Sequence, residues 1–150
     1  MENIAYNESW FGLFSAWFQG DRNAVKLAGD VLSVLHLWDD IVDGDAVSDV
    51  NNIFRKAIYD IPRNPVFQAN LGEFTSALKF VVDQWEVANT FEAAKIELDK
   101  SYMLRAQVFQ IFVLISEVVG GHEWKQKVAP EIWKAYGEDL PAYKEEMNNA

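Results

Sequence analysis

Three aspartates and one histidine near residue 40 are the side chains of this sequence best suited to chemistry. Residues 35–45 read LHLWDDIVDGD. On a helix, four polar residues of this stretch share an arc of about 100°: His36, Asp39, Asp40 and Asp43. Carboxylates on one helical face suit Mg²⁺, which takes one or two of them and completes its octahedron with water and phosphate oxygens. The spacing therefore predicts a magnesium site formed by Asp39, Asp40 and Asp43.

The position of these aspartates in their helix is unfavourable, which favours a bound cation. An aspartate inside a helix costs roughly 0.5–0.7 kcal/mol relative to alanine. A carboxylate near a helix C-terminus also opposes the helix dipole by about 0.3–1 kcal/mol. No lysine or arginine occurs between Lys26 and Arg55 to neutralise the charge. A divalent cation would neutralise it, and the alternative is a solvated helix end whose aspartates face water.

The helix that carries the aspartates is expected from Asp21, as its N-cap, to Gly44, as its C′ residue. Apolar residues cover most of its circumference, so we expect other helices to surround it. Gly29 and Ser33 continue the polar stripe of His36 toward the N-terminus. This stripe predicts that Gly29, Ser33 and His36 line a polar cavity, although a single helical histidine is also compatible with a structural role.

Length and composition are those of one globular domain. The chain has 150 residues and 50% of them are hydrophobic, which is enough to bury a core and argues against disorder. The net charge is −10, so we expect no nucleic-acid partner, because phosphate contacts need clustered lysine and arginine. The chain has no cysteine, which excludes disulfides, thiol chemistry and cysteine-based zinc sites.

The sequence gives no sign of targeting to a membrane. The first residues, Met1 to Ile4, lack the positive start and apolar run of a signal peptide. No stretch of about 18 uncharged apolar residues is present. We therefore expect a cytoplasmic chain without a membrane span.

Apolar spacing predicts helices throughout and no strand. We expect an all-α fold, a single bundle of about five or six helices over residues 1–150. The expected helices cover residues 8–18, 21–44, 48–61, 65–86 and 91–119, with one or two short helices within 122–150. Asn7, Ser48 and Asn64 are the expected N-caps of three of them, and Pro65 follows the last of these caps.

The aromatic segment 8–18 has two interpretations. Its apolar residues recur at helical spacing: Trp10, Leu13, Phe14, Trp17 and Phe18. The simpler interpretation is a helix packed on the core. The alternative is a dimerisation face, because the same stripe serves either purpose.

The charged half of segment 91–119 also has two interpretations. Glu97 and Lys100 lie one turn apart and favour an exposed, ion-paired surface. The alternative directs Lys100 or Arg105 at a phosphate group of a ligand.

The stretch 35–45 resembles the first aspartate-rich motif, DDxxD, of the isoprenoid diphosphate synthases and the related squalene and phytoene synthases. The resemblance implies an all-helical, isoprenoid-synthase-like core in which Asp39, Asp40 and Asp43 hold Mg²⁺. The metal would bind the diphosphate of an allylic substrate and assist its departure. Lys100-Ser101, followed by Val118 to Gly121, is similar to the family's Lys-Thr helix that ends in glycines. No second aspartate-rich motif follows, so the cavity is either completed across a homodimer or absent in a non-catalytic relative.

Three functions therefore remain open. The first is Mg²⁺-dependent binding of a diphosphate ester, with ionisation or transfer as the reaction. The second is a non-catalytic, homodimeric interaction or assembly protein. The third comes from residues 28–32, AGDVL, which resemble a helix of the all-α nucleotide pyrophosphohydrolases.

Overall fold

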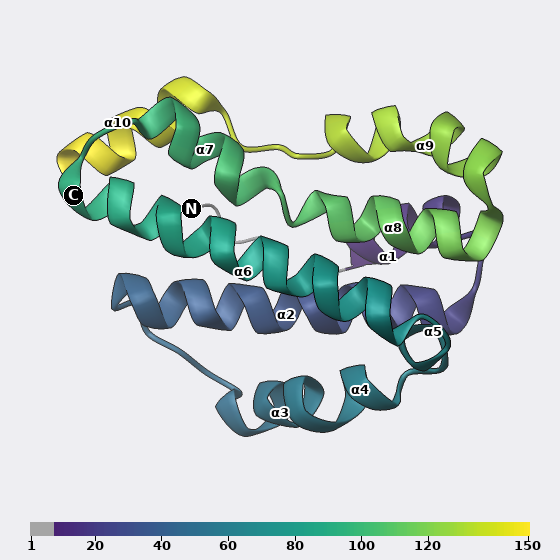
Figure 1. The fold of residues 1–150 in the computed structure, drawn as a ribbon. Helices are drawn as coiled ribbons and strands as arrows, with labels where there is room; N and C mark the ends of the chain where they lie inside the picture. Colours follow the sequence, from purple (N-terminus) through teal and green to yellow (C-terminus); the bar gives the residue numbers. More distant parts are fainter. Residues whose placement is uncertain (1–7) are drawn as a thin grey trace.

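The computed structural model describes residues 8–150, and this part of the chain is helical with no strand (Figure 1). Its elements, in chain order, are α1 (Glu8–Trp17), α2 (Arg22–Asp43), α3 (Val50–Arg55), the π-helical turn η1 (Lys56–Asp60), α4 (Ile61–Arg63), α5 (Pro65–Ala69), α6 (Leu71–Ala94), α7 (Leu98–Ala106), α8 (Phe109–Gly120), α9 (His122–Lys134) and α10 (Leu140–Asn149). The all-α prediction is confirmed. The predicted number of five or six helices is too low, because three of the expected helices, over 48–61, 65–86 and 91–119, are divided into shorter segments.

The helix α2 lies in the middle of the bundle. It contacts α1, α8 and the segment from α3 to α5, and eleven of its 22 residues are buried. Its predicted ends are confirmed: the Asp21 carboxylate accepts a hydrogen bond from the Ala24 N–H at 2.9 Å, and Gly44 ends the helix with φ of 75°. The expectation that other helices surround this one is also confirmed, and it follows from the width of the apolar surface.

The segment predicted as one helix over 91–119 is divided among three helices. α6 continues through Asn89 and Thr90, where a new helix was expected, and ends at Ala94. Lys95 and Glu97 then adopt left-handed conformations with φ of 56° and 50°. This turn sends α7 and α8 back along α6, as Figure 1 shows. The prediction was wrong because no glycine or proline marks the turn.

Two of the expected N-caps can be compared with the structure, and the third, Asn7, lies outside the described residues. Asn64 caps α5 as predicted, since its side-chain oxygen Oδ1 accepts a hydrogen bond from the Val66 N–H at 2.9 Å. Its amide also donates to the backbone carbonyl of Asn23 at 2.9 Å and so joins α5 to α2. Ser48 is not a cap, because α3 begins at Val50 after Asp49 in a left-handed conformation.

The aromatic side chains of α1 pack into the core, which confirms the simpler of the two interpretations of this segment. Phe14 and Phe18 are fully buried, and Phe14 lies 5.0 Å from the ring of Phe112 on α8. Trp124 on α9 adds a hydrogen bond from its indole N–H to the Trp17 carbonyl at 2.8 Å. The aromatic side chains of α1 therefore belong to the core that α1 shares with α2, α8 and α9.

One segment of the described chain, Leu98–Gly120, is long and apolar enough to cross a membrane by composition alone, with a mean hydropathy of 1.5. Half of that stretch is buried inside the bundle as parts of α7 and α8. A buried core helix has the same composition as a membrane span.

Candidate functional site

The three predicted metal ligands lie in three different environments near the end of α2. Asp39 is buried, with 4% of its surface exposed, whereas Asp43 is exposed in the last turn. Asp40 is half-buried, and its carboxylate lies 3.3 Å from Nε2 of His36. Among residues 8–150, no three histidine, aspartate or glutamate side chains converge closely enough to hold a metal ion.

Arg105 from α7 supplies the positive charge that the sequence argument could not find near Asp39. Its Nη1 donates to the Asp39 carboxylate at 2.9 Å, between residues 66 positions apart in the chain. Along the chain, the nearest lysine or arginine on either side of Asp39 is Lys26 or Arg55. Arg105 comes from another helix, so the burial of Asp39 is compensated inside the protein.

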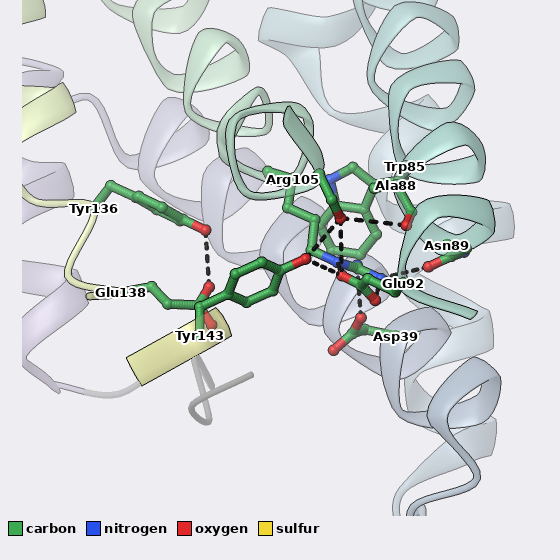
Figure 2. A network of polar contacts seen from close by, with 10 residues as sticks. Asp39, Trp85, Ala88, Asn89, Glu92, Arg105, Tyr136, Glu138 and Tyr143 are labelled. Carbon is green, nitrogen blue, oxygen red and sulfur yellow. Dashed lines mark hydrogen bonds and ion pairs between the residues drawn. The ribbon is translucent and has the colours of Figure 1, made fainter. Parts of the chain in front are cut away.

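Two further residues, both on α6, hold the guanidinium of Arg105 (Figure 2). Glu92 accepts from Nε through one oxygen and from Nη2 through the other, at 2.6 Å for Nη2. Asn89 accepts a second hydrogen bond from Nη2. The ring of Trp85 lies 5.1 Å from the guanidinium carbon, a favourable cation–π distance. We call Asp39, Asn89, Glu92 and Arg105 the arginine cluster.

The last helix of the chain joins the arginine cluster through a phenol. The hydroxyl of Tyr143 donates to Glu92 at 2.6 Å and lies 2.6 Å from the hydroxyl of Ser101. Both Tyr143 and Ser101 are buried. The cluster therefore links four helices, α2, α6, α7 and α10, and its charged groups all have partners within the protein.

One cation serves two carboxylates in the arginine cluster, and the two carboxylates titrate differently. Burial raises the pKa of Asp39 from its usual 3.8 to about 6, although the charge of Arg105 opposes the shift. Burial would also raise the pKa of Glu92, but its hydrogen bonds and ion pair with Arg105 lower it overall. Arg105 bonds Glu92 with two nitrogens and Asp39 with one, which explains why Glu92 is the better stabilised anion.

The two residues proposed for phosphate binding, Lys100 and Arg105, differ in exposure. Lys100 is exposed and lies 2.9 Å from Glu97, so the predicted surface ion pair is confirmed. Arg105 is only 3% exposed and makes four hydrogen bonds within the arginine cluster. The structure does not bring these two residues together.

The residues predicted to line one polar cavity do not share one. Gly29 lines a cavity of about 660 Å³ near the start of α2. The Ser33 hydroxyl donates to the Gly29 carbonyl at 2.9 Å within the helix. His36 borders a small void of about 10 Å³ beside Trp85 and Arg105, and in the described part of the chain its buried Nδ1 has no hydrogen-bond partner. Gly29 and His36 therefore border two different cavities.

Asn89, Glu92 and Tyr143 were not predicted as site residues, and the sequence contains only a weak indication of their role. Arg105 is the last charged residue before the apolar stretch that forms α8. A single arginine at the edge of a buried stretch needs an anionic partner, which is a usable signal. The identity of that partner depends on how α6 and α7 pair, and this was not predicted.

The comparisons with known proteins give no further guide to function. No family model matches the chain, and no curated protein and no solved structure is similar to it.

Proposed function

We propose that the chain is a non-catalytic helical assembly protein that pairs with a second copy of itself. The burial of Asp39 against Arg105 supports a non-catalytic role, because it accounts for the most buried of the three predicted metal ligands without a metal ion. The pairing rests on a second observation, the presence of two exposed surfaces of opposite charge in consecutive parts of the chain.

The first surface is basic and apolar and lies on the segment from α3 to α4. Its exposed residues are Phe54, Arg55, Ile58, Tyr59 and Arg63. Ile58 is 72% exposed, the highest fraction among the large hydrophobic residues of the described chain. Arg55 and Arg63 lie 5.2 and 5.1 Å from the Tyr59 ring, which holds both cations against an aromatic face.

The second surface is acidic and apolar and covers the last turn of α2 and the loop that follows it. Its exposed residues are Ile41, Val42, Asp43, Asp45 and Val47. Hydrophobic residues exposed in groups are typical of surfaces that bind another protein.

A twofold dimer would join each basic surface to the acidic surface of the other copy. In such a dimer, residue i of the first copy contacts residue j of the second copy, and residue j of the first copy contacts residue i of the second copy. The two surfaces match in charge and both expose aliphatic or aromatic side chains. A second copy of this acidic chain is therefore the partner that fits.

The test is the oligomeric state of the purified chain by sedimentation velocity. We expect a dimer at micromolar concentration that dissociates as salt is raised, because salt screens exposed charges. The variant Arg55→Glu/Arg63→Glu should weaken the dimer at least tenfold, and so should Asp43→Lys/Asp45→Lys. Combining all four changes should restore it. A matched control, Lys79→Glu/Lys134→Glu, reverses two exposed lysines on α6 and α9 and should leave the dimer intact. A monomer at every concentration would contradict the proposal.

Magnesium-dependent binding of a diphosphate ester is the second candidate. Its support is a cavity of about 360 Å³ beside the arginine cluster, lined by the acidic residues Asp43, Asp45, Glu92 and Glu146. This candidate predicts that millimolar Mg²⁺ with pyrophosphate raises the melting temperature and that Asp43→Asn abolishes the rise. Under the assembly proposal, neither protein responds.

A further inference from the structure

A second cavity, of about 660 Å³, opens on the first half of α2, away from the arginine cluster. It lies between α1, α2 and η1, with walls contributed by all three elements. This volume falls within the range of small-molecule sites, roughly 300–1,000 Å³. The cavity therefore has room for a ligand, unlike the void beside His36.

Three cationic side chains line this cavity, although the chain as a whole is strongly acidic. Arg22 and Lys26 lie one turn apart on α2, and Lys56 comes from η1. The chain has 13 lysines and arginines against 23 aspartates and glutamates. The cavity is therefore lined by three cations, although the net charge of the whole chain is negative.

A buried carboxylate holds two of the cations in place. Asp30 is 5% exposed and lies 2.6 Å from Nζ of Lys26 and 3.9 Å from Nζ of Lys56. Asp60 makes a longer contact to Lys26, at 3.5 Å. Arg22 has no ion-pair partner among residues 8–150. The three cations thus exceed the two carboxylates by one charge, and Arg22 is available to an anion.

The remaining wall of the cavity is apolar or small. Phe11 and Ser15 come from α1, one turn apart, and Val25 and Gly29 come from α2. Phe11 is largely exposed, so an aromatic ring lies next to the cavity without being covered by the protein. The lining therefore combines a cationic side with an apolar side.

We propose that this cavity binds an organic anion with one oxyanion head group, a carboxylate or a phosphate, and a short apolar body. Arg22 and Lys56 contact the head group, since a guanidinium can bond two oxygens of such a group at once. Asp30 positions the lysines, and the apolar body lies against Phe11 and Val25. This site does not depend on the homodimer, because its ligand lies within one chain.

The experiment is isothermal titration calorimetry with octyl phosphate, octanoate, octylamine and inorganic phosphate. We expect the two octyl anions to bind at micromolar to low millimolar concentration and inorganic phosphate to bind at least tenfold more weakly. Octylamine should not bind. If octylamine binds as tightly as the octyl anions, the cavity does not select an anion. If inorganic phosphate binds as tightly as octyl phosphate, the apolar wall does not contribute to binding. Either result would overturn the proposal.

Variants test whether the binding occurs in this cavity. Arg22→Gln and Lys56→Gln should each weaken octyl phosphate binding at least fivefold without changing the melting temperature by more than a few degrees. Lys79→Gln is the matched control, because it removes a cation on α6 outside the cavity. The proposal would be overturned if Arg22→Gln and Lys56→Gln bind octyl phosphate as tightly as Lys79→Gln does. It would also be overturned if the wild type does not bind octyl phosphate at 5 mM.

Discussion

α2 buries two aspartates, and their surroundings differ in kind. Asp39 meets an arginine from a distant helix, within a cluster in which the charged groups are all paired. Asp30 meets Lys26 on its own helix and Lys56 from η1, beside a cavity of about 660 Å³. The first arrangement joins four helices, and its one cation is already bonded to Asp39, Asn89 and Glu92. The second leaves a cation available next to open space, which is why we place small-molecule binding there.

The largest expected effect comes from removing the shared cation. Arg105→Leu leaves Asp39 and Glu92 buried without a positive partner, and such a loss costs about 3–5 kcal/mol. Urea unfolding of the variant and of the wild type measures the difference. The triple change Arg105→Leu, Asp39→Asn and Glu92→Gln should recover part of this loss, since it also removes the buried charges. A loss below about 1 kcal/mol in the single variant would show that the cluster is solvated rather than buried.

A smaller effect is expected in the pH dependence of the unfolding free energy, to which the two carboxylates of the arginine cluster contribute differently. The pKa of Asp39 is about 6 in the folded protein and near 3.8 in the unfolded chain, so the folded state binds the proton more tightly. The wild type should therefore gain about 1 kcal/mol of unfolding free energy as the pH falls from 7 to 5. Asp39→Asn should gain about 1 kcal/mol less than the wild type over the same pH range.

The pH window matters because Glu92 acts in the opposite direction. Its lowered pKa means that its contribution is present above the unfolded value of 4.5 and is lost as the pH falls below that value. The pKa values of Asp43 and Glu138 are also raised by burial, so both add to stability in the same direction as Asp39. The difference between the wild type and Asp39→Asn at pH 7, 6 and 5 therefore isolates Asp39. If the wild type and Asp39→Asn respond to pH in parallel over this range, the assignment to Asp39 is wrong.

The smallest effect is expected at the other buried aspartate. Asp30→Asn should cost less than about 1 kcal/mol, because the ammonium of Lys26 is largely exposed and can turn to water. Thermal unfolding of the variant and of the wild type measures this loss of stability. A loss as large as that of Arg105→Leu would mean that both ends of α2 are held in the same way, and the comparison between them would fail.

The parts of the fold that were predictable are those governed by local rules. The ends of α2 follow from Asp21 as N-cap and Gly44 as a left-handed C′ residue, and Asn64-Pro65 marks the start of α5. The burial of α8 follows from its nearly uninterrupted apolar residues. These signals need only the neighbouring residues, so a single sequence contains them.

The candidate site could not be derived in this way, because its contacts connect distant segments. The sequence indicated that Asp39, Asp40 and Asp43 need a compensating cation, and for Asp39 the structure supplies Arg105, 66 positions away. The pairing of α6 with α7 places Glu92 beside Arg105, and the turn that creates it uses left-handed Lys95 and Glu97. Neither residue type favours that conformation, so the turn has no local signature.

The hydrogen bond from Tyr143 to Glu92 joins α10 to the interior of the bundle. Segments with few buried residues ordinarily open first and exchange their amide hydrogens quickly, and Tyr143 is the buried residue of α10. Because this helix is tethered to a charge in the interior, its protection from exchange should follow that of α6 and α7. Tyr143→Phe would then release α10 while the rest of the molecule stays closed.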